Sequence, residues 1–96
     1  MKGKLWLRLM KQQKIKQDLV IPADQDNWQE ALIQGCHQLD ISAPVILLRH
    51  LRDWVEYSQT RFLSDDFIDH FPFDKLEVEY FEEGKRPAPS DDYQNA

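Results

Sequence analysis

The feature that most constrains the fold is a separation of charge between the two ends of the chain. Residues 1–17 contain six cations and no acid. Because the 96-residue chain has a net charge of −5 and this segment contributes +6, residues 18–96 carry −11. Near the other end, Glu77 and Glu79 alternate with apolar side chains. Opposite charges on adjacent strands stabilise a sheet face, so we expect the basic segment beside this acidic strand.

The N-terminal segment has the period of a β-hairpin. Residues 5–10 alternate leucines with other side chains, and residues 15–21 carry a second apolar series. A helix over residues 5–10 is the rival interpretation, but its apolar stripe would end after two turns. We place the turn at residues 11–14, although Gln12 and Gln13 are not the Asn-Gly or Asp-Gly pair that tight hairpins favour.

A first helix is predicted over residues 26–40. Asp26 is suited to cap its start, and Leu32 and Cys36 belong to an apolar series at helical spacing. Gly35 lies inside this helix, where glycine is about 1 kcal/mol less favourable than alanine. We expect either close packing of Gly35 against the sheet or a bend in the helix.

A second helix is predicted over residues 50–59, and residues 44–49 have two interpretations. They form either a buried strand or the start of a longer helix capped by Ser42. In the helical interpretation one side carries the apolar residues Leu47, Leu48, Leu51, Trp54 and Val55.

Together these patterns predict the α+β class. The expected fold is a small antiparallel sheet, made from the N-terminal hairpin and the C-terminal strand with 44–49 as a candidate further strand, covered on one face by two helices. Residues 1–83 would form this single domain. Residues 84–96 are rich in Pro, Ser and Asp and have little to bury, so we expect a disordered C-terminal tail.

The residue inventory excludes several kinds of chemistry. The single cysteine, Cys36, rules out an internal disulfide, a zinc knuckle and a Cys-x-x-Cys redox pair. The histidines lack the spacing that places two imidazoles on one helical face, and the three glycines are too far apart for a phosphate-binding loop. We predict no catalytic residue, no cofactor and no metal site. No apolar run suits a signal peptide or a membrane span, which favours a cytoplasmic protein without a membrane partner.

Two small constellations have ordinary explanations. Cys36 falls on the apolar stripe while His37 points about 100° away, so we expect packing rather than a nucleophile and base. His50 and Asp53 are three residues apart and would share a surface hydrogen bond. A further acidic cluster consists of Asp65, Asp66 and Asp69, with Asp74 nearby. Ser64 ahead of it predicts a short capped helix, and the sequence leaves open whether the cluster does more than cap.

The function remains open at this level, and the leading hypothesis is a small protein-interaction module. It would contact a protein partner or a second copy through a sheet face whose residues are Trp6, Arg8, Glu77, Glu79 and Phe81. Exposed aromatic rings would make this face a contact surface, and a covering layer would make it a second core. Binding to nucleic acid is not expected. An acidic nucleic-acid mimic and a small enzyme with a carboxylate site are the alternatives.

Overall fold

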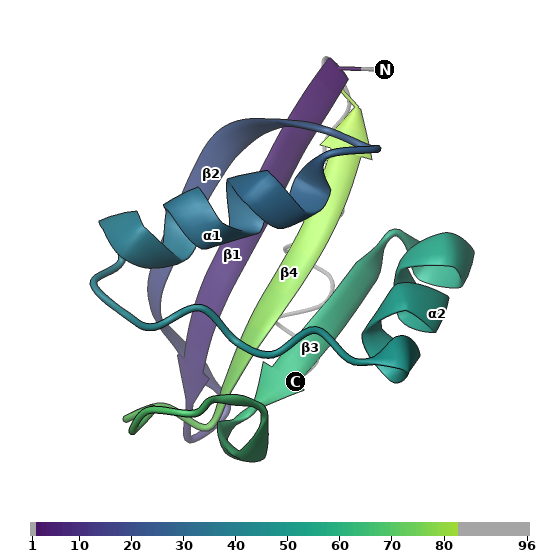
Figure 1. Ribbon diagram of the computed structural model, residues 1–96. Helices are drawn as coiled ribbons and strands as arrows, with labels where there is room; N and C mark the ends of the chain where they lie inside the picture. Colours follow the sequence, from purple (N-terminus) through teal and green to yellow (C-terminus); the bar gives the residue numbers. More distant parts are fainter. Residues whose placement is uncertain (1, 83–96) are drawn as a thin grey trace.

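The computed structural model describes residues 2–82 as a four-stranded sheet with two α-helices (Figure 1). The elements, in chain order, are β1 (Lys2–Lys11), β2 (Lys14–Asp24), α1 (Trp28–Gln38), α2 (Leu48–Tyr57), β3 (Gln59–Leu63), the 3-10 turn η1 (Ser64–Asp66) and β4 (Lys75–Glu82). The predicted α+β class is therefore confirmed. The tail predicted for residues 84–96 lies outside the described residues.

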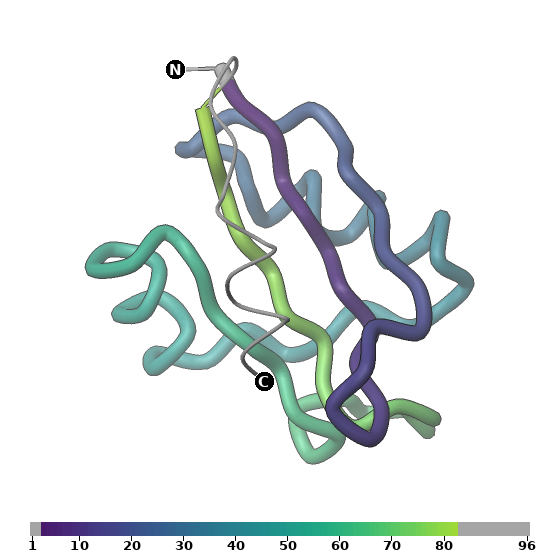
Figure 2. The backbone as a smooth tube through the Cα atoms, turned by 180° about the vertical axis from the view of Figure 1, so that it is seen from behind, coloured from purple at the N-terminus to yellow at the C-terminus, as the bar shows by residue number. Residues whose placement is uncertain are grey.

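The sheet has the order β2-β1-β4-β3, and every adjacent pair of strands is antiparallel. Figure 2 shows the same order from the other side, with β1 and β4 at the centre. Arg8 is directly opposite Glu77 and Trp6 is opposite Glu79. The expected pairing of the basic first strand with the acidic last strand is thus confirmed.

The turn of the hairpin between β1 and β2 is formed by Gln12 and Gln13, which are not residues that tight turns favour. Gln12 has φ 55° and Gln13 has φ 64°, and two consecutive positive φ values are typical of a tight type I′ hairpin. The backbone N–H of Gln12 donates to the Asp74 carboxylate at 2.7 Å. This contact from the segment before β4 helps to hold a turn that lacks the usual Asn-Gly chemistry.

Residues 44–49, for which the sequence left a strand and a helix open, form no strand, and only the last two of them are helical. Residues 41–47 have no regular structure, and α2 begins at Leu48. The edge of the sheet is occupied instead by β3, which we did not predict. Its alternation of exposed and buried residues includes only two buried side chains, Thr60 and Phe62. A period of two cannot be recognised over so short a segment.

Both predicted helices exist, but their first turns differ from expectation. Asn27 is the N-cap of α1, with no side-chain cap hydrogen bond, so the expected Asp26 cap is wrong. In α2 the backbone N–H of Leu47 donates to His50 Nδ1 at 2.8 Å. His50 takes the place that Glu or Gln has in an ordinary capping box, a role that residue preferences did not predict.

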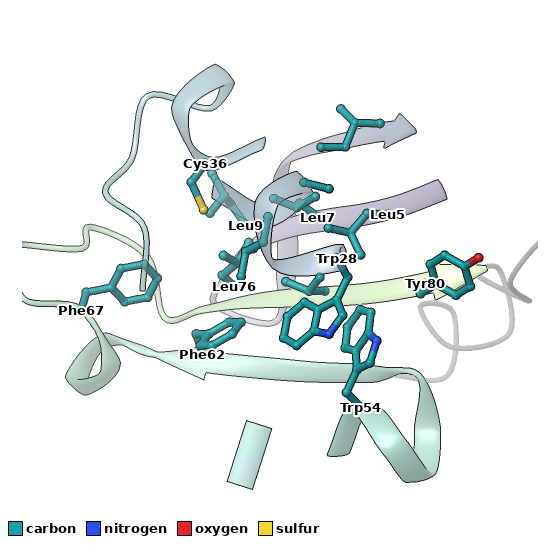
Figure 3. Packing of buried hydrophobic residues seen from close by; sticks show 14 of the residues in the cluster. Leu5, Leu7, Leu9, Trp28, Cys36, Trp54, Phe62, Phe67, Leu76 and Tyr80 are labelled. Carbon is teal, nitrogen blue, oxygen red and sulfur yellow. The ribbon is translucent and has the colours of Figure 1, made fainter. Parts of the chain in front are cut away.

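The core lies between the sheet and the two helices, on one face of the sheet. Strand β1 contributes Leu5, Leu7 and Leu9, which pack with side chains of β4 and α1. Trp28 of α1 and Trp54 of α2 stack with ring centroids 4.0 Å apart and an interplanar angle of 15° (Figure 3). This stack joins the two helices over the same sheet face, as predicted.

Gly35 shows why α1 contains an interior glycine. A Cβ atom at this position would lie 2.7 Å from Cδ2 of Leu7 and 3.3 Å from Cδ1 of Ile21. The helix backbone therefore approaches the sheet more closely than any larger residue permits without movement. Close packing, the first of the two expected explanations, accounts for the glycine.

Candidate interaction surfaces

The five residues expected to bind a partner lie together on the sheet face opposite the helices. Arg8 is central: its Nε lies 3.2 Å from Glu77 Oε1 and its Nη1 lies 3.1 Å from Glu79 Oε1. Lys75 also pairs with Glu77, at 3.2 Å. The acidic residues of β4 are therefore neutralised largely by neighbours in the same sheet.

Trp6 and Arg8 are much less accessible than the interaction hypothesis assumed. Trp6 is 8% exposed and Arg8 is 6% exposed. The indole N–H of Trp6 donates to Asp18 at 3.0 Å, and the Arg8 guanidinium lies 4.4 Å from the Trp6 ring centroid. Phe81 on β4 is half-buried. The structure brings these side chains together, and partner binding by them stays a prediction.

A second surface, made of apolar side chains, is exposed along α2. Leu48 is 63% exposed, Leu51 38% and Val55 85%. Their spacing places them on one side of the helix, and we call these three residues the α2 stripe. Of the helix's own residues only His50 and Trp54 are buried. Most of the apolar side that the sequence shows on this helix is therefore exposed.

The position of α2 explains this exposure. The helix lies beside β3 at the edge of the sheet rather than across its centre (Figure 1). An apolar arc that includes Trp54 and Val55 is wider than the surface that this edge can cover. The Trp54 side meets Trp28 and the core, while the α2 stripe remains open to solvent. The apolar arc was visible in the sequence, but which half of it would be covered was not.

Charged residues border the α2 stripe in an ordered way. Arg49 and Arg52 occupy the first half of the helix, and Asp53 and Glu56 the second half. Arg49 pairs with Asp66, and Asp53 accepts a hydrogen bond from the Thr60 hydroxyl at 2.9 Å. Arg52 and Glu56 are exposed, and neither forms an ion pair within residues 2–82. The helix thus has a basic beginning and an acidic end.

A buried polar cluster holds the start of α2 against η1. His50 is fully buried, and its Nε2 lies 3.5 Å from Asp66 Oδ2. Asp66 also accepts the backbone N–H of Leu63 at 2.9 Å and pairs with Arg49. Burial lowers the pKa of His50, against the opposing effect of the Asp66 carboxylate.

The chemical role of this cluster is structural. A histidine with no exposed surface cannot reach a substrate, so the cluster fixes the helix start rather than forming a catalytic pair. The expected surface hydrogen bond between His50 and Asp53 is wrong. His50 turns inward to Leu47 and Asp66, while Asp53 turns to Thr60.

The remaining acidic residues of the predicted cluster fasten loops. Asp69 accepts a hydrogen bond from the Ser42 hydroxyl at 2.8 Å, and Asp74 accepts the Gln12 N–H. Asp65 is exposed in η1. Over residues 2–82, no three His, Cys, Asp or Glu side chains come together in a group that could hold a metal ion. Hydrogen bonds to loop residues account for Asp69 and Asp74. The expected Ser64 cap is wrong, because Ser64 is the first residue of η1 and Leu63 is its N-cap.

Cys36 packs in the core, as expected from its position on the apolar stripe of α1. Its side chain is buried in the same core cluster as Leu9 and Leu76 (Figure 3), whereas His37 is exposed. Burial raises the pKa of the thiol to about 12. A thiol with this pKa is protonated and unreactive at neutral pH.

An open groove lies beside β3, next to Arg8 and Glu77. Its lining residues are Arg8, Asp53, Tyr57, Gln59, Thr60, Arg61 and Glu77. Most of its polar groups are already engaged, because Arg8 pairs with Glu77 and Asp53 accepts from Thr60. The groove therefore offers few convergent polar groups for a small ligand.

None of the helices in the described part of the chain is both long and apolar enough to cross a membrane. Comparison with models of known protein families gave no match. Searches of curated proteins and of solved structures likewise found no significant similarity.

Proposed function

We propose that this chain is a small protein-interaction module and that it meets its partner through the α2 stripe. The observation that carries the proposal is the exposure of Leu48, Leu51 and Val55 on a helix whose neighbouring flank is anchored in the core by Trp54. Burial of one such aliphatic side chain contributes about 1.5–3 kcal/mol, so covering three of them is a substantial driving force. Rigid helices that present an apolar row are a recurring mode of protein recognition.

The sheet face around Arg8 supports this function less well. Its aromatic residue Trp6 is buried, and the Arg8 charge is matched by Glu77 and Glu79. A partner would meet half-buried glutamates already paired with Arg8. The same pairing weakens the case for a nucleic-acid mimic, which needs an open row of negative charge. The α2 stripe, in contrast, is accessible apolar surface whose side chains are exposed to solvent.

A matched pair of surface variants tests the proposal. Val55→Glu places a charge on the α2 stripe, whereas Ile68→Glu places one on an equally exposed residue outside it, since Val55 is 85% exposed and Ile68 88%. Affinity capture and sedimentation of the full chain would be compared for the wild type and both variants. We expect association that Val55→Glu weakens at least about tenfold and Ile68→Glu leaves intact. Absence of any association, or equal loss in both variants, would overturn the proposal.

A further inference from the structure

We infer that the open face of the sheet is a binding surface for residues 83–96 of the same chain. The open face is the one opposite the two helices, and β1 directs Trp6, Arg8 and Met10 to it. This inference is independent of the α2 stripe, because α2 lies beside β3 at the edge of the sheet (Figure 1). The observation that carries it is the burial of these three side chains on a face that neither of the described helices covers.

The side chains that β1 directs to the open face are as buried as core residues. Trp6 is 8% exposed, Arg8 6% and Met10 7%. Yet Trp6 and Met10 do not belong to the hydrophobic core cluster under the helices. A side chain on a sheet stands roughly perpendicular to it, so neighbours in the sheet flank the side chain but leave its outer end open. A further layer is needed to exclude water from that end.

Contacts among the open-face residues do not account for this burial. The Arg8 guanidinium lies 4.4 Å from the centroid of the Trp6 ring, so it covers part of the indole. Glu77 and Glu79 pair with Arg8 from the neighbouring strand, and both are half-buried themselves. A residue that covers its neighbour turns its own outer surface to solvent, but Trp6 and Arg8 are both buried. The covering layer therefore comes from outside the sheet.

Residues 83–96 have the position and the length to form this layer. They follow directly on Glu82, which ends a central strand and lies opposite Gly3. From Lys75 to Glu82 the strand β4 spans about 23 Å, whereas fourteen extended residues reach about 46 Å. Gly84 adopts the backbone conformations of tight turns without steric cost. A turn at this glycine lets the segment run back along the whole open face.

The prolines of the segment come to the level of Trp6. Pro87 and Pro89 begin three residues after Gly84, which places them over Glu79, the β4 residue opposite Trp6. Extended proline-rich segments bind aromatic surfaces, and the fixed φ of proline lowers the entropy lost on binding. The composition of residues 84–96 predicted disorder because the segment has little to bury by itself. Such a segment becomes ordered when a preformed surface supplies the apolar contacts.

The acidic residues of the segment come to the basic end of the open face. Asp91 and Asp92, a few residues beyond the prolines, reach the level of Lys75. The same end carries Arg61 of β3, which is exposed and forms no ion pair within residues 2–82. Opposite charges set the orientation of two surfaces that meet. The charges therefore favour the direction in which the segment folds back along β4.

A spin label on the full chain tests where the segment lies. A nitroxide is attached at Ser90→Cys, and the native Cys36 stays unlabelled because it is buried and its thiol pKa is raised to about 12. We expect the label to broaden the backbone amide signals of Arg8 and Glu77 strongly. The signal of His37, which is exposed on α1 beyond the other face, should stay sharp. Equal broadening of both sets of signals, or none, would overturn the inference.

A mixed sample identifies which molecule provides the segment. Spin-labelled chain without isotopes is combined with isotope-labelled chain without a spin label, so any broadening then arises between molecules. We expect the signals of Arg8 and Glu77 to stay sharp in this mixture, because each segment binds its own sheet. Broadening as strong as in the first sample would assign the contact to a second copy and overturn the inference.

Quenching of tryptophan fluorescence by acrylamide tests the contact with Trp6 independently. The chain has three tryptophans, and Trp28 and Trp54 are buried in the core on the other face. In the wild type we expect all three to be protected. Replacing Pro87 and Pro89 together by glycine should release the segment, because it removes the rings and restores the backbone entropy that binding must overcome. The accessible fraction of the emission should then rise toward about one third, one tryptophan of three.

A matched control places two glycines in the same segment beyond the predicted contacts. Gln94→Gly combined with Asn95→Gly should leave the quenching at the wild-type level. Adding Trp6→Phe to the proline variant should remove the accessible fraction, which assigns that fraction to Trp6. Equal quenching of the proline variant and the control, whether both are protected or both accessible, would overturn the inference.

Discussion

Replacement of Gly35 by alanine should destabilise the protein, although the same change stabilises most helices. At an exposed interior position of a helix, Gly→Ala is worth about 1 kcal/mol of added stability. At Gly35 the new methyl group would lie 2.7 Å from Leu7 Cδ2 and 3.2 Å from Leu7 Cδ1. Leu7 has no exposed surface, so it cannot move aside into solvent.

The magnitude follows from two opposing contributions. Overpacking of a close-packed core costs about 1–3 kcal/mol, and the gain in helix propensity offsets about 1 kcal/mol of this. We expect a net loss of about 1 kcal/mol in the free energy of unfolding. Urea denaturation followed by tryptophan fluorescence measures it, because Trp28 and Trp54 are both buried in the core. The exposed neighbour Gln34→Ala is the control and should change stability by less than about 0.5 kcal/mol.

A double-mutant cycle makes the reasoning refutable. Leu7→Ala alone should cost about 2–5 kcal/mol through the cavity it leaves. In the Gly35→Ala background its cost should be smaller by at least about 0.5 kcal/mol, because the added methyl group partly fills the space. If Gly35→Ala instead raised stability by about 1 kcal/mol with no coupling to Leu7, the close approach of α1 to the sheet would be wrong.

Three further predictions follow from local features. Replacing Gln12-Gln13 by Asn-Gly should raise the free energy of unfolding by about 1 kcal/mol, because both residues have positive φ; an unchanged urea midpoint would contradict the turn geometry. The pKa of His50 is lowered in the folded protein, so the unfolded chain binds a proton first and stability should fall as the pH decreases through 6.5, by at most about 1.4 kcal/mol per pH unit. His50→Gln, which keeps an acceptor for the helix start, should remove this part of the pH dependence while the exposed His37→Gln retains it; equal slopes would refute the assignment. The Cys36 thiol, with its pKa raised to about 12, should react with a thiol reagent at pH 8 only after denaturation, and rapid reaction in the native protein would contradict its burial.

The central strands could be predicted because their sequence carries two independent signals. A period of two and a complementary charge pattern both point to β1 beside β4, and Arg8 indeed lies opposite Glu77. The hairpin was predicted from the same alternation, even though Gln12 and Gln13 argued against a tight turn. Where several residues repeat one pattern, local preference and global fold agree.

The edge of the sheet could not be predicted, because its pattern is short and its environment is set by distant residues. Strand β3 shows only Thr60 and Phe62 as buried positions, too few for a recognisable period. The burial of His50 depends on Asp66, which follows β3 in the chain. Helical periodicity likewise gave the apolar arc of α2 but not which half would face solvent, and the α2 stripe was therefore missed.

The placement of β4 between β1 and β3 has a consequence for the order of folding during synthesis. A nascent chain can close the hairpin of β1 and β2 as soon as both have left the ribosome, since their contacts are local. The other edge of β1 then stays unpaired until β4 has been made. For that interval the chain presents an open strand edge that can pair with another molecule. A chaperone that shields such edges would raise the yield of folded protein more than one that acts on helices.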